Sequence, residues 1–239
     1  MEITKVYELP TTDNVCNQIL REVYGHKDKW SMAHVTMEPR AESLYHRHQK
    51  MDEVYIITKG CGDLIIGRYV HRVMTGNIVW ISAGLPHMLR NVGLVEELEH
   101  LVLACPAFDP LDVIMAEIPK QLPPPRVLEL PPFTQAFDGA QIFSLSPPTE
   151  TRLSFAFGFP SHWSEENRPH YHKQTTEWMY VVNGSGYLEK NDDLVMVDAG
   201  DWIKIKPLER HQISLHGSSN LVVMCLCDPK FSMDDVFFD

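Results

Sequence analysis

The sequence lacks the features by which membrane, secreted and nucleic-acid-binding proteins are recognised. It contains no apolar run of about eighteen residues, so we expect no membrane-spanning helix. Residues 1–15 contain neither a cationic nor an apolar segment, so we expect no signal peptide. The net charge is −11, which argues against a nonspecific nucleic-acid partner and against anionic membrane surfaces. An anionic small molecule remains a compatible partner, because the charge of a pocket matters more than the total.

Cysteine is also scarce, and its spacing is irregular. The chain has five cysteines, an odd set that does not resemble a disulfide framework: Cys16, Cys61, Cys105, Cys225 and Cys227. Cys225 and Cys227 would share one face of a strand, where we interpret them as small buried hydrophobic residues in preference to a redox or metal-binding pair. The simplest interpretation is a cytoplasmic protein.

Proline is concentrated in one stretch, which predicts a domain boundary. Residues 119–132 contain six prolines. Proline fixes φ and removes a backbone donor, so we expect this connection to run extended on the surface. Lys5–Pro10 resembles Arg126–Pro131 at an offset of 126 − 5 = 121, which marks the start of a second copy. We therefore expect an N-terminal domain over residues 1–122 and a C-terminal domain over residues 123–239.

One histidine pattern occurs twice with a constant offset. The first copy is His46, His48, Glu53, Gly60, Gly62, Gly76 and His87, and the second is His170, His172, Glu177, Gly184, Gly186, Gly200 and His211. Each member of the second set is its counterpart plus 170 − 46 = 124. A repeat of this length is too long for a solenoid unit and suits a small domain. We infer a duplicated domain that kept three histidines and one carboxylate in each copy.

Short strands separated by turns dominate both copies. The expected strands are rich in β-branched and aromatic residues and cover residues 53–58, 63–66 and 78–81 in the first copy and 177–182, 187–189 and 202–205 in the second. Glycine-rich turns separate the first two strands of each set. This pattern predicts an all-β protein built as an antiparallel sandwich or barrel. One helix is expected near Asp109 to Glu117.

The repeated residues are suited to binding a metal. Alternate residues of a strand point to one face, so His46 and His48 should aim together. We predict one divalent transition metal per domain, bound by His46, His48, Glu53 and His87 in the first and by His170, His172, Glu177 and His211 in the second. These ligands suit Mn, Fe, Ni, Co, Cu or Zn without distinguishing among them. An octahedral metal would keep two positions open for water, O₂ or a chelating substrate, as a catalytic site requires.

The same residues resemble the cupin motifs. His46-x-His48-x4-Glu53-x6-Gly60 resembles the first motif, and His170-x-His172-x4-Glu177-x6-Gly184 matches it again. Gly76-x7-Gly84-x2-His87-x3-Asn91 resembles the second motif, with Ser82 where the family usually has proline. The corresponding Gly200-x10-His211 keeps the spacing, but Pro207 is displaced by one, Leu208 replaces the glycine and Leu215 replaces the asparagine. The resemblance implies a bicupin: two tandem jelly-roll β-barrels (double-stranded β-helices) with few short helices and a metal inside each barrel.

Strand parity suggests which side chains line each barrel. Tyr55 and Ile57 share the face of Glu53, as Met179 and Val181 share the face of Glu177. Leu89 and Ile213 follow the last histidine of each set by two residues. Both pockets should therefore be mostly apolar, with Met179, Leu89 and Ile213 as candidate substrate contacts or as residues that only fill the barrel. Arg168 replaces Leu44 and is a candidate to bind a substrate carboxylate or phosphate, with a solvated loop arginine as the alternative.

The expected function is that of a metalloenzyme acting on a small organic acid, diketone or aromatic compound. Oxygenase or decarboxylase chemistry is the first expectation, and a sugar or keto-acid isomerase is the alternative. Candidate catalytic residues are Glu53 and Glu177, mainly as ligands, and Tyr55, although its ordinary pKa is high for a base. A metal-dependent binding protein without catalysis is a third hypothesis. Trp80 should point outward from its strand, which suggests a homodimer.

Overall fold

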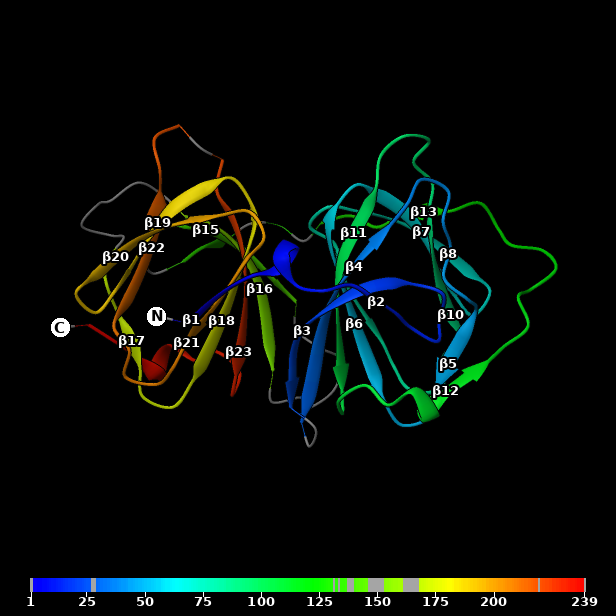
Figure 1. Ribbon diagram of the computed structural model, residues 1–239, viewed down its shortest axis with the longest axis horizontal. Coiled ribbons are helices and arrows are strands. Elements are labelled where there is room, and N and C mark those ends of the chain that lie inside the picture. Colours follow the sequence, from blue (N-terminus) through cyan, green and yellow to red (C-terminus); the bar gives the residue numbers. More distant parts are fainter. Residues whose placement is uncertain are drawn as a thin grey trace. The chain divides into compact units, whose positions relative to one another are not determined.

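The chain forms two β-rich units (Figure 1). The structure, a computed structural model, describes residues 2–26, 29–130, 132, 134–136, 140–145, 153–160, 168–218 and 220–238. One unit is Glu8–Leu130, and the other combines Met1–Tyr7 with Pro131–Asp239. Helical structure within the described residues is limited to the 3₁₀ turns η1 (Val6–Glu8), η2 (Pro110–Asp112) and η3 (Met233–Asp235). No helix in this part of the chain has the length and hydropathy needed to cross a bilayer. The all-β prediction is confirmed.

The unit Glu8–Leu130 consists of two six-stranded sheets. One sheet has the order β2 (Thr12–Asp13), β3 (Ile19–His26), β4 (Trp30–Met37), β11 (Leu98–Cys105), β6 (Asp52–Lys59) and β9 (Ile78–Ile81). The other has the order β12 (Val113–Met115), β5 (His46–His48), β10 (His87–Asn91), β7 (Cys61–Ile66), β8 (Tyr69–Met74) and β13 (Arg126–Val127). Alternating apolar side chains of both sheets, including Val35, Ile57 and Leu64, pack together in one buried core.

The second unit repeats this plan with different strand counts. Its large sheet has the order β1 (Glu2–Lys5), β21 (Asp201–Ile205), β18 (Thr176–Asn183), β23 (Val222–Asp228), β16 (Ser154–Phe159), β15 (Gln141–Leu145) and β14 (Thr134–Gln135). The smaller sheets are β20 (Asp193–Asp198), β19 (Ser185–Lys190) and β22 (His211–Leu215), and β17 (Tyr171–His172) with β24 (Val236–Phe237). Val181, Leu188, Ile203 and Val223 belong to its buried core.

The opening segments of the two repeats are exchanged between the units. β1 pairs with β21 of the second unit, where Lys5 forms an ion pair of 2.7 Å with Asp201 and the amide of Val6 donates to the carbonyl of Gly200 at 2.9 Å. The corresponding segment of the second repeat, β13, pairs with β8 of the first unit. The structural units therefore differ from the expected 1–122 and 123–239 division, because residues 1–7 complete the sheet formed by residues 131–239.

The helix expected near Asp109 to Glu117 is wrong. The structure has only the turn η2 there, and β12 follows it. β12 runs antiparallel to β5, with Val113 opposite His48 and Met115 opposite His46. The β-branched residues of this segment favour a strand, and the exposed edge of β5 supplies the hydrogen-bonding partners. The segment that the sequence placed in a helix thus borders two candidate metal ligands.

Candidate metal centres

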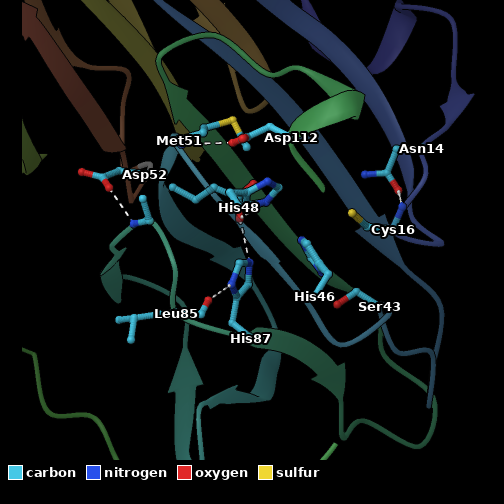
Figure 2. Close-up of polar contacts among 12 residues, drawn as sticks. Asn14, Cys16, Ser43, His46, His48, Met51, Asp52, Leu85, His87 and Asp112 are labelled. Carbon is cyan, nitrogen blue, oxygen red and sulfur yellow. Dashed lines mark hydrogen bonds and ion pairs between the residues drawn. The ribbon is translucent and has the colours of Figure 1, made fainter. Parts of the chain in front are cut away.

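The four ligand candidates of the first unit converge from three strands, and Figure 2 labels the three histidines among them. His46 and His48 lie on β5, Glu53 on β6 and His87 on β10. One ligand atom from each residue lies within 4.8 Å of the others, and all four side chains are buried. Nε2 of His87 is 2.8 Å and Nε2 of His48 is 3.4 Å from Oε2 of Glu53. The structure therefore brings together the whole set that the sequence singled out.

Backbone carbonyls orient two of these imidazoles. Nδ1 of His46 donates to the carbonyl of Leu44 at 2.8 Å, and Nδ1 of His87 donates to the carbonyl of Leu85 at 3.0 Å. Each hydrogen bond leaves Nε2 facing the other ligands, which is how second-shell partners of metal-bound histidines work. Figure 2 shows the bond from His87 to Leu85 below the centre. The rings are thus already positioned for coordination.

The electrostatics of this cluster also suit a cation. Burial alone would raise the pKa of Glu53, but hydrogen bonds and charge from His48 and His87 lower it well below its usual range. Burial and repulsion from His87 lower the pKa of His46 to about 4. Burial alone would lower the pKa of His87. The hydrogen bond to Glu53 and the negative charge of Glu53 outweigh this effect, so the pKa of His87 is raised. An anionic carboxylate and a neutral imidazole are metal ligands, and a cation would replace the shared proton.

The second unit repeats the arrangement. His170 forms an isolated bridge with His211 of β22, while His172 lies on β17 and Glu177 on β18. Their ligand atoms again lie within 4.8 Å of one another, although His170 is only partly buried. Nε2 of His211 is 3.1 Å and Nε2 of His172 is 3.5 Å from Oε2 of Glu177. Each unit therefore contains one compact set of three imidazoles and one carboxylate.

The charge states of the second set parallel those of the first. Burial and repulsion from His211 lower the pKa of His170 to about 3. Burial would raise the pKa of Glu177, but hydrogen bonds from His172 and His211 lower it well below its usual range. Nδ1 of His211 donates to the carbonyl of Glu209 at 3.0 Å, which leaves Nε2 for the centre. Both donor sets fit a divalent transition metal on chemical grounds.

The predicted pocket residues lie in the barrel cores. Tyr55 and Leu89 belong to the core of the first unit, while Met179 and, at its edge, Ile213 belong to that of the second. Burial and the charge of Glu53 raise the pKa of Tyr55 well above its usual range, so its phenol stays protonated. These side chains therefore pack the barrel behind the ligands, and their contact with a substrate stays a prediction.

Arg168 contacts an aromatic residue, Phe238, whose ring also lies near the second centre. Its guanidinium is 4.0 Å from the centroid of the Phe238 ring, in a cation–π contact. The Phe238 ring is in turn 6.3 Å from the His170 ring. Arg168 is exposed, so its charge can still reach a ligand. Its role in substrate binding stays a prediction.

The structure also places residues near the centres that sequence reasoning missed. Asp112 and Asp235 accept backbone hydrogen bonds from the loops between the histidine pairs and the glutamates. The signal was present as Phe108-x3-Asp112-Val113 and Phe231-x3-Asp235-Val236, which share an offset of 231 − 108 = 123. A second missed residue is Cys16, labelled in Figure 2, whose backbone carbonyl accepts the amide of Leu44 at 2.9 Å. Burial and the charge of Glu53 raise the pKa of the Cys16 thiol to about 12.

Several solved structures share this fold. Oxalate decarboxylase from Bacillus subtilis has a TM-score of 0.69 at 15% identity, covering 97% of this chain and 77% of that one. A second structure of that enzyme, studied for its Mn(II) centres, has a TM-score of 0.67 at 14% identity, covering 97% and 78%. Oxalate decarboxylase from Lactobacillus farciminis in a formate complex has a TM-score of 0.67 at 15% identity, covering 96% and 87%. At these identities the likeness establishes the fold.

Sequence comparisons identify the family. An uncharacterized protein of Methanocaldococcus jannaschii is 27% identical over 82 residues, which are 34% of this chain and 62% of that protein, less than two thirds of its length. The cupin domain family matches twice, at residues 33–103 and 159–227. The first match contains all four ligand candidates of the first set, and the second match contains all four of the second set. This chain therefore belongs to the cupin family and carries a cupin domain in each half.

Proposed function

We propose that this bicupin is a metal-dependent enzyme with decarboxylase or oxygenase chemistry on a small organic acid. The observation that carries the proposal is the convergence of three imidazoles and one carboxylate in both units. A metal with open coordination positions would polarise a bound carboxylate or bind O₂. The fold shared with oxalate decarboxylases, one of them studied for its Mn(II) centres, supports a carboxylic acid as substrate and manganese as the first metal to test.

In this proposal the glutamates act as ligands. Glu53 and Glu177 each contact two histidines and have lowered pKa values. At neutral pH they therefore stay ionised, so they can bind a cation and do not exchange protons. Tyr55 stays protonated beside Glu53 and serves as a hydrogen-bond donor in preference to a base. The isomerase alternative is weaker, because enediolate chemistry requires a group that takes up protons near neutral pH and neither Tyr55 nor the two glutamates is such a group.

The second centre is our proposed substrate site. Its ligand His170 is partly exposed, whereas all four ligands of the first centre are buried. Arg168 contacts Phe238, and the Phe238 ring lies near the ring of His170. The counterpart of Arg168 in the first repeat is Leu44, which has no charge. A guanidinium can bind a carboxylate with two parallel hydrogen bonds. The first centre would then mainly serve as a closed metal site.

Metal analysis followed by an activity panel tests the proposal. We expect about two metal ions per chain in the purified protein, one per ligand set. With Mn, Fe or Cu restored separately, CO₂ release and O₂ consumption are measured on oxalate, keto acids, diketones and catechols. Turnover of an acid by either readout supports the proposal. Metal binding without turnover on the panel would favour the binding-protein hypothesis, and failure to bind metal would overturn both.

A further inference from the structure

A buried aspartate fixes the loop that joins the metal ligands in the first unit. The loop between His48 and Glu53 presents the backbone amides of Lys50 and Met51 to Asp112. Both amides donate to the same oxygen, Oδ2, at 3.1 Å each. Asp112 is 8% exposed and is the last residue of the turn η2, after which β12 pairs with the histidine strand β5. Figure 2 shows Asp112 joined to Met51 above His48.

The second unit contains the same device in a tighter form. Asp235 receives the backbone amides of Lys173, Gln174 and Thr175 at 3.0 to 3.2 Å, with both carboxylate oxygens in use. Its backbone carbonyl also accepts Nδ1 of His172 at 3.1 Å. After Asp235, β24 pairs with β17, which carries His172. This carboxylate therefore binds the loop while the same residue orients a ligand ring.

An aromatic ring completes the arrangement in each copy. The ring of Phe108 meets the His48 ring edge-on at 6.3 Å, and the ring of Phe231 meets the His172 ring edge-on at 6.1 Å. The amides of Phe108 and Phe231 each donate to a serine hydroxyl at 2.9 Å, which anchors the segment to the barrel. The repeated Phe-x3-Asp-Val segment thus contacts the second histidine of each set through its phenylalanine ring and pairs with it through its valine.

We propose that Asp112 and Asp235 are positioning residues that set the spacing between the His-x-His pair and the glutamate, and thereby the metal affinity of their own centres. A carboxylate that accepts hydrogen bonds from two or more backbone amides can hold a loop in place, and it does not need to bind the metal itself to do so. Neither aspartate contributes a ligand atom to the described sets, so each acts through the backbone. The inference rests on the proposed metal-dependent function.

The different use of the carboxylate oxygens gives a sharp test. Asp112→Asn keeps an oxygen that can accept both amides, whereas Asp235→Asn places an amide donor against backbone donors. We expect Asp235→Asn and Asp235→Ala to speed metal release from one centre by about 10- to 100-fold. Asp112→Ala should act similarly on the other centre, while Asp112→Asn should stay within about threefold of wild type because its hydrogen bonds survive.

Release is followed from manganese-loaded full-length protein after addition of a chelator, and the metal-to-chain ratio is measured after dialysis. Asp109→Asn and Asp234→Asn are matched controls, because Asp109 caps η2 and Asp234 lies in η3, both are exposed, and the hydrogen bonds of these two residues stay within the turns. Thermal unfolding of the metal-free variants separates positioning from general stability, since Asp235→Asn and the two alanine variants should change the release rate more than the unfolding temperature if the proposal holds.

Wild-type release rates in both alanine variants would overturn the inference alone. Equal losses in Asp112→Asn and Asp235→Asn would also contradict it, because the two carboxylates are satisfied differently. If an alanine variant does not fold, the asparagine pair still decides the question. A wild-type protein that binds no manganese, nor any other divalent transition metal, would instead overturn the proposed function.

Discussion

The two cupin domains share their ligand geometry and differ in what surrounds it. In the barrel of the first unit, Tyr55 and His100 lie side by side with ring centroids 4.9 Å apart. The strand pairing places Met179 and Val223 at the equivalent positions of the second unit. Both units therefore keep the residues that converge on a point, while the Tyr55 and His100 pair of the first barrel is replaced by Met179 and Val223 in the second.

The polar lining of the first barrel carries an energetic cost. His100 is fully buried, and neither ring nitrogen has a hydrogen-bond partner among the described residues. Burial and repulsion from His34 lower the pKa of His100 to about 3, so the ring stays neutral. An unsatisfied buried polar group costs about 1–3 kcal/mol, whereas a valine in its place costs nothing of this kind. At this position the first barrel therefore carries an acid-sensitive group that the second barrel lacks.

Removing one ligand from each centre gives the largest expected effect. His87→Ala and His211→Ala should each lower the metal-to-chain ratio from about two to about one, because three ligands bind more weakly than four. If the second centre binds substrate, His211→Ala should reduce turnover by at least about 100-fold while His87→Ala reduces it less. Elemental analysis and steady-state kinetics check both parts. The opposite ranking in turnover would assign catalysis to the first centre.

Trimming the buried side chain that directly follows the exchanged strand β1 should destabilise only the second unit. Val6 is fully buried, and Val6→Ala should lower the unfolding free energy by about 2 kcal/mol through loss of packing. Hydrogen-exchange mass spectrometry should show faster exchange in β21 (Asp201–Ile205). The matched variant Leu128→Ala, in the corresponding segment, should act on β8 (Tyr69–Met74). Equal effects of either variant on both strands would contradict the exchange of segments.

The charge difference between the centres should appear in substrate affinity. Arg168→Leu converts the second centre to the residue found at the first, and we expect an approximately tenfold rise in KM for a carboxylate substrate. Turnover at saturation should change less, because Arg168 is not a metal ligand. Leu44→Ala is the control and should leave KM within about twofold. An unchanged KM in Arg168→Leu would remove the arginine from the substrate site.

The smallest expected effect is on the pH dependence of stability. The folded-state pKa of His100 is lowered to about 3, so below the ordinary value near 6.5 the unfolded chain takes up the proton first. Its neutral form therefore stabilises the fold fully above about pH 6.5, and this contribution declines as the pH falls toward 3, by about 1 kcal/mol at pH 5.5.

His100→Val should reduce this acid sensitivity of the metal-free first unit, measured by urea unfolding at pH 5.5 and 7.5. Val223→His, the reverse exchange, should introduce it in the second unit. If His100→Val leaves the pH dependence unchanged, the ring is not buried as a neutral group in solution.

The sequence predicted the features that depend on spacing. The constant offset of 124 and the alternation of strand residues placed His46 and His48, and later His170 and His172, on common faces, and the structure brings both sets together. The segment after Asp109 was predicted wrongly, because its edge-strand pairing with β5 depends on a partner more than sixty positions away. The exchange of β1 could not be predicted either, because the similarity between Lys5–Pro10 and Arg126–Pro131 does not show which barrel each segment pairs with.

That exchange also affects the order in which the protein can fold. Lys5 and its partner Asp201 are 196 positions apart along the chain. At typical synthesis rates of about 5–20 residues per second, the first strand leaves the ribosome about 10–40 s before the strand that receives it. The strand β1 therefore cannot pair with β21 until the residues of the first barrel and most of the second have been synthesised.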